Sequence, residues 1–320
     1  MKDSVLFLTD RYCDGKPEMG ESPLYGNIVN SFSRMDIDLT FNAIHFDESL
    51  EVYNKHIDDV LVSYCERYKP KVIFCTLLGQ YAGNPSPGCL KRLKDSGIRI
   101  VLIWPDTGPG WGVQTILEYK DSISLSISLD NPISSFHNSV EWGDNHMFLW
   151  CPQDPHLFKL KQEKSTPYGF IGSSRYPDRE YYLRQVMSQI PDFEVFGGQR
   201  ESKTTSFDYA EKIRDTEICV NFSQSPAQFF QTKSRVWEVL ACGGLLLESA
   251  NPSTASKLTP GLDYVEFFNP KDLIDKIRYY HHNRQEMIAI AKHGYQTFQA
   301  KYTNEAFWSE VFQKINKCTN

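Results

Sequence analysis

Three charged side chains in one short segment could bind an anionic ligand. Lys233 and Arg235 stand near the start of a predicted helix, and Glu238 follows Arg235 by three residues. Two cations at a helix start suit a diphosphate, because the free backbone N–H groups there also attract anions. A carboxylate suits the hydroxyl groups of a ribose. A solvated ion pair on the helix surface is the alternative interpretation of the same spacing.

The residues around these side chains predict the elements that would position them. Apolar residues recur at helical spacing from Val236 to Leu240, which indicates a helix with one face packed inward. Two consecutive glycines end this helix, and Leu245–Leu247 then form a short apolar run typical of a parallel strand covered on both faces. Nucleotides bind where helix starts meet the carboxyl ends of parallel strands. The sequence therefore predicts an anion site at the edge of a parallel sheet.

A second predicted strand also ends in residues that suit a phosphate. The strand at 168–172 runs into small residues and a cation before a helix at 178–190. This order directs backbone N–H groups and a positive charge at an anion. The candidate binding residues here are Gly172, Ser173, Ser174 and Arg175. Gly197 follows the next predicted strand and would allow close approach of a ligand or of another backbone segment.

Two residues of the first half are candidates for proton transfer. Asp106 directly follows a predicted strand at 98–104 and could act as a general base toward an acceptor hydroxyl. His45 ends a predicted strand at 39–46 and could serve as an acid, a base or a phosphate contact. A turn-capping aspartate and a structural histidine are the alternative interpretations. No metal ligands are predicted, because the Asp36-Ile37-Asp38 sequence indicates a turn.

Charge is distributed unevenly along the 320 residues. Residues 1–150 carry 13 basic and 20 acidic side chains, and the remainder carries 21 and 20. Nucleic-acid binding draws on clustered Lys and Arg, so an acidic first half argues against a polyanionic partner. The second half is therefore the better host for a small anionic ligand.

Cysteine usage and hydropathy bear on the cellular setting. The eight cysteines are scattered without a C-x-x-C pair, and several lie in apolar segments, which indicates reduced buried thiols. No apolar run approaches the ~20 residues of a membrane span, and no signal peptide is recognisable. We expect a cytoplasmic protein.

Strands and helices alternate through both halves, which predicts an α/β fold with parallel sheets. One amphipathic helix is predicted at 49–67 and another at 304–317. A proline-rich, charged stretch after residue 150 predicts an interdomain connection.

The second half resembles the C-terminal domain of GT-B glycosyltransferases. The resemblance rests on FIGSSRYPDRE, on KSRVWEVLACGGLLLES, and on Gly261 followed by PKDLIDKIRYY, and it is closest to the group typified by the CgeB spore-maturation proteins. It implies two Rossmann-like domains facing a cleft, with a C-terminal helix that crosses back to the first. The implied domains are an acceptor domain at 1–152 with 303–320, a linker at 153–166, and a nucleotide-sugar donor domain at 167–302.

The resemblance also implies roles for single residues. Lys233 and Arg235 would neutralise the leaving diphosphate without a metal, and Glu238 would bind the ribose. The family binds the sugar diphosphate at the mouth formed by the loop after the predicted strand at 218–222 and the helix that follows, which makes candidate contacts of Asn221, Ser223, Gln231 and Thr232. Many retaining members carry another glutamate eight positions before Glu238, where this chain has Phe230. Retention at the anomeric carbon is therefore suggested by kinship but left open. No cofactor is expected beyond a nucleotide-diphosphate sugar as co-substrate, with a UDP- or GDP-sugar favoured.

The expected function is transfer of a sugar from this donor to an acceptor hydroxyl. Two alternatives are a nucleotide-sugar epimerase on the same fold and a non-catalytic nucleotide-sugar-binding protein. The acceptor could be a glycan, a protein, a small molecule or a modified nucleobase.

Overall fold

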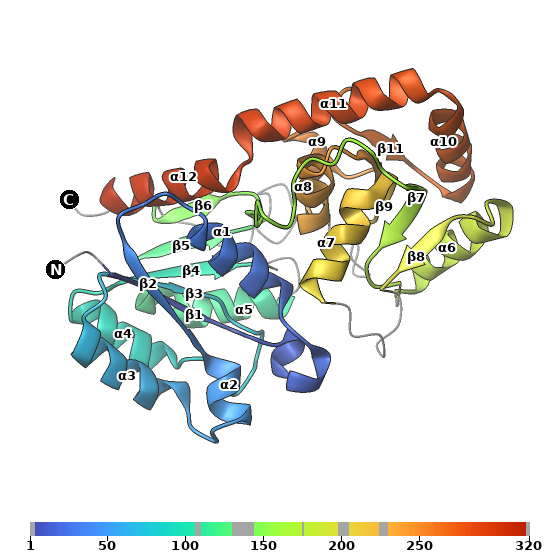
Figure 1. The fold of residues 1–320 in the computed structure, drawn as a ribbon. Helices are drawn as coiled ribbons and strands as arrows, with labels where there is room; N and C mark the ends of the chain where they lie inside the picture. The colour runs from blue at the N-terminus through green and yellow to red at the C-terminus, as the bar shows by residue number, and fades with distance from the viewer. Residues whose placement is uncertain are drawn as a thin grey trace. The chain divides into compact units, whose positions relative to one another are not determined.

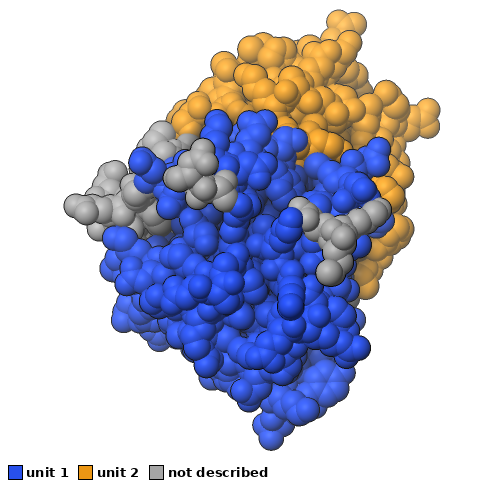
Figure 2. Space-filling view, turned by 90° about the vertical axis from the view of Figure 1, so that its left-hand side faces the viewer, with its two compact units in different colours: residues 1–149, 307–320 blue, residues 150–306 orange. Residues whose placement is uncertain are grey.

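The chain forms two compact units. The computed structural model describes residues 4–105, 110–129, 144–174, 176–197, 205–223 and 230–317. Unit 1 comprises residues 1–149 and 307–320, and unit 2 comprises residues 150–306, coloured blue and orange in Figure 2. Each unit is built on a wholly parallel sheet, so the predicted α/β fold with two parallel sheets is confirmed. The domain limits and linker predicted from the sequence stay a prediction.

The sheet of unit 1 has six strands in the described part of the chain, in the order β2-β1-β3-β4-β5-β6 (Figure 1). Nearly every residue of β1, β3 and β4 is buried, as expected for parallel strands covered on both faces. The strands are β1 Ser4–Thr9, β2 Thr40–His45, β3 Val72–Cys75, β4 Arg99–Trp104, β5 Leu125–Ser128 and β6 His146–Phe148.

Helices cover this sheet by contact with alternate residues of its strands. Leu6 and Leu8 of β1 belong to a core whose helical residues come mainly from three helices on one face. Those helices are α3 Ile57–Tyr68, α4 Pro87–Asp95 and α5 Gly110–Tyr119. The remaining short elements before residue 149 are η1 Cys13–Gly15, η2 Pro17–Met19, η3 Tyr25–Asn30, α1 Ser31–Ser33, α2 Phe46–Glu51 and η4 Lys120–Ser122.

The prediction of a single helix at 49–67 is wrong, since two helices occupy this part of the chain. α2 ends at Glu51 and α3 begins at Ile57. Between them Asn54 has a φ of 48°, a left-handed conformation that interrupts a right-handed helix. His56 then caps α3 by accepting a hydrogen bond from the Asp58 N–H.

The opposite face of β1 is covered by aromatic residues and by the last helix, α12 Asn304–Lys317. Trp308 of α12 is fully buried, with its ring 5.9 Å from Phe7, 5.0 Å from Phe32 and 5.2 Å from Phe74. Its indole N–H donates to the Ser31 hydroxyl over 3.0 Å. The end of the chain therefore completes the core of unit 1.

The sheet of unit 2 has five strands in the described residues, in the order β11-β10-β9-β7-β8. They are β7 Thr166–Ile171, β8 Glu194–Phe196, β9 Thr216–Asn221, β10 Leu245–Ser249 and β11 Val265–Phe267. The helices are α6 Pro177–Gln189, α7 Ser206–Asp215, α8 Ser234–Ala241, α9 Pro252–Ala255, α10 Pro270–His282 and α11 Arg284–Lys301.

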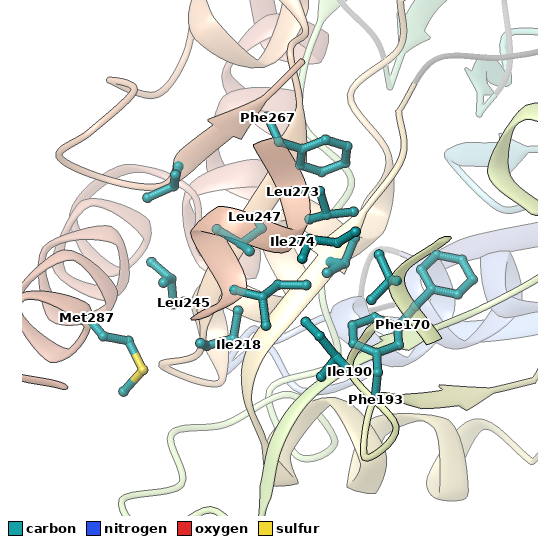
Figure 3. Close-up of a cluster of buried hydrophobic side chains, with 14 of the residues drawn as sticks. Phe170, Ile190, Phe193, Ile218, Leu245, Leu247, Phe267, Leu273, Ile274 and Met287 are labelled. Atoms are coloured by element: carbon teal, nitrogen blue, oxygen red, sulfur yellow. The ribbon is translucent and has the colours of Figure 1, made fainter. Parts of the chain in front are cut away.

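One face of this second sheet carries an apolar core. Leu245 and Leu247 of β10 and Ile218 of β9 pack with Leu273 of α10 and Met287 of α11 (Figure 3). The intervening residues of β9 and β10 point to the other face, which α8 covers. Polar residues at the carboxyl ends of β9 and β10 therefore lie beside the start of α8.

The strand order of unit 2 reverses direction between β7 and β9. The chain leaves β7 for β8 on one side and then returns to β9 on the other. In open parallel sheets, ligands bind outside the carboxyl ends of the strands at such a switch point. This place in unit 2 is thus the first candidate for a binding site.

Candidate functional site

Glycines surround the carboxyl end of β7. Gly172 directly follows this strand, and its N–H donates to the Phe196 carbonyl of β8 over 2.8 Å. Gly197, which follows β8, would place a Cβ 3.7 Å from the backbone of Gly172. The two predicted glycines therefore lie side by side, and neither places a side chain of its own at the strand ends.

Arg235 reaches this point from the first turn of α8. Its Nη1 donates to Oδ1 of Asn221 at the end of β9 over 2.7 Å, and its guanidinium carbon lies 5.1 Å from the centre of the Phe170 ring. Its Nε is buried without a hydrogen-bond partner among the described residues. Buried N–H groups are normally satisfied, so this one is available to a bound acceptor atom.

Gly172 and Arg235 are in close contact. A Cβ built on Gly172 would overlap with Nη2 of Arg235. Gly172 also has a φ of 142°, a conformation that residues with a side chain rarely adopt. A glycine is therefore required here both for its backbone conformation and for the approach of the guanidinium.

Two polar residues connect Arg235 to the interior of unit 2. Asn221 is fully buried, and its Nδ2 donates to the Ser223 hydroxyl over 3.1 Å and to Oε2 of Glu248 over 2.7 Å. Glu248 is also fully buried, at the neighbouring position of β10. Burial raises the pKa of Glu248 to about 7, although hydrogen bonds from Ser223, Asn221 and Asn251 and the charge of Arg235 act in the opposite direction.

A second arginine, Arg179 of α6, lies at the same strand ends. It donates to the backbone carbonyls of Ser173 and Phe222. Its guanidinium carbon lies 5.5 Å from the centre of the Phe170 ring, the same ring that Arg235 approaches. Sequence reasoning missed this residue because Arg179 lies in the first turn of the helix and not in the loop before it.

Glu238 of α8 is buried beside a tyrosine. Its Oε2 accepts a hydrogen bond of 2.6 Å from the Tyr209 hydroxyl of α7, and only 3% of Glu238 is exposed. Burial, together with the charge of Glu238, raises the pKa of Tyr209 well above its usual value. Tyr209, like Arg179 and Glu248, was not among the residues predicted from the sequence.

The remaining candidates of unit 2 surround the start of α8. Lys233 occupies the N-cap position and its Nζ donates to the Gln231 side chain. Thr232 is buried, and its hydroxyl has no hydrogen-bond partner in the described part of the chain. Ser173 and Ser174 are half-buried in the turn after β7. Arg175 lies outside the described residues.

His45 lies in unit 1, at the end of β2. Its Nδ1 is 3.4 Å from the Thr9 hydroxyl and its ring meets the Tyr25 ring edge-on, with 5.0 Å between centroids. Burial lowers the pKa of His45, and Arg11 adds to this effect while Glu48 and Asp47 oppose it. His45 also lines a pocket of about 320 Å³ together with Glu48, Ser49, Tyr53 and Lys55. Asp106 lies outside the described residues.

Asp47 fixes the loop that follows β1, next to His45. It is fully buried and accepts hydrogen bonds from the backbone N–H groups of Arg11 and Tyr12, at distances of 2.8 to 3.0 Å. The loop after β1 is thus anchored to the start of α2. The backbone of this loop, next to His45, is therefore held in one position.

The described residues contain no group of three or more histidine, cysteine or carboxylate side chains placed to bind a metal ion. None of their helices combines the length and the apolar character that a membrane crossing requires.

The sequence comparisons identify a family in the second half of the chain. Residues 170–313 match the family described as glycosyl transferase-like. This range contains the predicted segments around Gly172 and Arg235. A search of curated proteins by sequence finds no significant match.

Solved structures share the fold over nearly the whole length. HepE of Anabaena, solved with UDP and glucose, is 10% identical with a TM-score of 0.67, covering 98% of this chain and 99% of HepE. Sucrose-phosphate synthase of Thermosynechococcus elongatus is 11% identical with a TM-score of 0.67, covering 99% of each chain. AviGT4, a glycosyltransferase of avilamycin A biosynthesis, is 10% identical with a TM-score of 0.60, covering 98% of this chain and 97% of its own.

At these identities the structures establish the fold alone, and the family assignment comes from the sequence match. The predicted resemblance is thus confirmed at the level of family and fold, while the closer likeness to the CgeB group stays a prediction. Residues 170–313 therefore match a glycosyl transferase-like family, and the chain shares the fold of solved structures that include the glycosyltransferase AviGT4.

Proposed function

We propose that this protein transfers a sugar from a nucleotide diphosphate to an acceptor hydroxyl, with the donor bound at the carboxyl ends of β7 and β9. One observation carries the proposal. The Arg235 guanidinium is held there by Asn221, and its buried Nε has no partner among the described residues. A diphosphate oxygen is the acceptor that such a cation suits best, since charged hydrogen bonds to phosphate are strong and directional.

The chemistry of the reaction explains the need for fixed cations. When the anomeric bond breaks, the departing nucleoside diphosphate gains negative charge. Arg235 would stabilise this charge from a preorganised position, and Lys233 would add a second cation at the start of α8. Arg179 would contribute to the positive potential of the same strand ends. In this proposal the leaving group needs no metal ion.

The donor nucleotide is proposed to be uridine-based. HepE, which shares the fold, is described in complexes with UDP and with UDP-glucose. Glu238 would bind the ribose hydroxyls, and its hydrogen bond with Tyr209 would hold its carboxylate in place. Retention of the anomeric configuration stays open, because Phe230 has no carboxylate to contribute.

The proposed acceptor side lies in unit 1. With a lowered pKa, His45 is neutral at pH 7 and can accept a proton from a hydroxyl group. Asp106 stays a second proposal for this role. We also propose a cytoplasmic location, because no disulfide joins the seven described cysteines and six of these are buried.

Calorimetric titration with UDP and GDP tests the donor site. We expect wild-type protein to bind UDP, and we expect Arg235→Ala to weaken this binding about tenfold or more. Arg284→Ala is the matched control, because Arg284 is an arginine of unit 2 whose bonds go to Glu217 at the surface. Equal affinities of the wild type and the Arg235 variant would contradict the assigned site.

Turnover assays separate the proposed transferase from its two alternatives. A transferase releases UDP from the donor when a suitable acceptor is present. An epimerase converts the sugar and leaves the anomeric bond to the diphosphate intact. A non-catalytic binding protein would bind UDP and leave every donor unchanged.

A further inference from the structure

A buried carboxylate lies behind the proposed phosphate-binding arginine. Glu248 occurs in β10, at the position that pairs with Asn221 of β9. Side chains at paired positions of neighbouring parallel strands point to the same face. Both residues are fully buried, so water does not compete for their hydrogen bonds.

The hydrogen bonds of Asn221 have a defined direction. A carboxyl oxygen that carries no proton accepts hydrogen bonds whether or not the other oxygen is protonated, and a side-chain amide has one donating and one accepting end. Because Oε2 of Glu248 accepts from Nδ2 of Asn221 over 2.7 Å, the opposite end of the amide, Oδ1, faces Arg235. Arg235 has only donors, so it requires this orientation. If the Asn221 amide were rotated by 180°, its N–H donors would face the N–H donors of Arg235.

The orientation of Asn221 determines where the guanidinium lies. Nη1 of Arg235 is bonded to Asn221 over 2.7 Å, and the guanidinium extends over Phe170 to touch Gly172. While Nη1 is bonded to Asn221, the buried Nε has no hydrogen-bond partner among the described residues. Its N–H lies in the same guanidinium plane as Nη1. The hydrogen bond at Nη1, together with the contacts to Phe170 and Gly172, restricts the plane of the guanidinium and so the directions of its other donors.

We propose that Glu248 is a positioning residue of the donor site: through Asn221 it orients the Arg235 guanidinium for the diphosphate of the nucleotide sugar. This inference rests on the proposed function. Glu248 need not touch the nucleotide to act in this way. Its contribution passes through the Asn221 amide, which makes it separable from a general effect on folding.

A double-mutant cycle measured by UDP calorimetry tests this role. Glu248→Ala removes the acceptor for Asn221, and we expect UDP affinity to fall about tenfold. In the Arg235→Ala background the same substitution should change UDP affinity less than twofold, because the residue it acts through is gone. Glu248→Gln keeps an acceptor oxygen for Asn221 and should retain affinity within about threefold of the wild type.

Glu266→Gln is the matched control, since Glu266 of β11 pairs with Glu248 on its other side and bonds to Tyr264 instead. Circular dichroism of each variant confirms folding, and the Gln variant supplies the measurement if the Ala variant does not fold. Affinity losses that add up in the double variant, or an affinity loss in Glu248→Gln equal to that of Arg235→Ala, would overturn the positioning role. If the wild-type protein did not bind UDP, both the proposed function and the positioning role of Glu248 would be overturned.

Discussion

Gly172 and Arg235 approach so closely that a single methyl group on Gly172 would occupy the space of Nη2 of Arg235. The glycine directly follows β7, and the arginine lies in the first turn of α8, 63 positions later in the sequence. The contact brings a cation to the carboxyl ends of β7 and β9, where open parallel sheets bind ligands. It therefore connects the fold of unit 2 directly with the proposed donor site.

Gly172→Ala should weaken nucleotide binding while unit 2 stays folded. The added Cβ would force Arg235 out of its bond with Asn221, and we expect a loss of UDP affinity of about tenfold or more. Gly261→Ala is the control, because Gly261 also has a positive φ, of 79°, but its added Cβ would meet no described atom within 4 Å. Equal UDP affinity of both variants would show that the Arg235 contact is unimportant.

Glu248→Gln should change how stability depends on pH. The folded protein holds the pKa of Glu248 at about 7, above its usual value of 4.5. Protonation of Glu248 therefore stabilises the fold fully below pH ~4.5, and this contribution is lost as the pH rises through 7. Glutamine does not ionise and has no such loss. The free energy of unfolding measured in urea should therefore become higher for the variant than for the wild type, by a difference that grows from pH 5 to pH 8 to at most about 3 kcal/mol. Parallel stability curves for the two proteins would contradict the raised pKa.

Trp308→Ala should destabilise unit 1 strongly. The fully buried indole packs against three phenylalanines and donates to Ser31. Its removal should lower the free energy of unfolding by about 3–5 kcal/mol. Glu310→Ala, on the exposed side of the same helix, should change it by less than about 0.5 kcal/mol. A small effect of Trp308→Ala in chemical denaturation would mean that α12 is dispensable for the core of unit 1.

His45→Gln tests the proposed acceptor side through the pH dependence of turnover. A general base must be unprotonated, and burial lowers the pKa of His45 below 6.5. The wild-type rate should therefore fall on the acidic side only below pH 6.5. The variant should lose this dependence together with about 100-fold or more in rate. An unchanged pH–rate profile in His45→Gln would remove His45 from the chemistry.

The central strands of both sheets could be predicted from the sequence because they contain short apolar runs, such as those of β3, β4 and β10. Leu245–Leu247 with the two glycines before it is the clearest case. The break between α2 and α3 could not be predicted in this way. It depends on a left-handed conformation at Asn54, which the amphipathic spacing of 49–67 does not reveal.

The proposed donor site could be predicted from the sequence only in part. Arg235 and Asn221 were selected because both stand at element ends, where ligands bind. Glu248 was missed because it lies in an apolar strand and its partner Asn221 is 27 positions away. A carboxylate at the end of an apolar strand was nevertheless a usable signal, the same one that selected Asp106.

A crystal structure with UDP bound would test the central claim most directly. We predict diphosphate oxygens within hydrogen-bond distance of the Arg235 guanidinium, at the carboxyl ends of β7 and β9, with Gly172 in contact with the same group. A diphosphate bound elsewhere, away from the Arg235 guanidinium, would contradict the account.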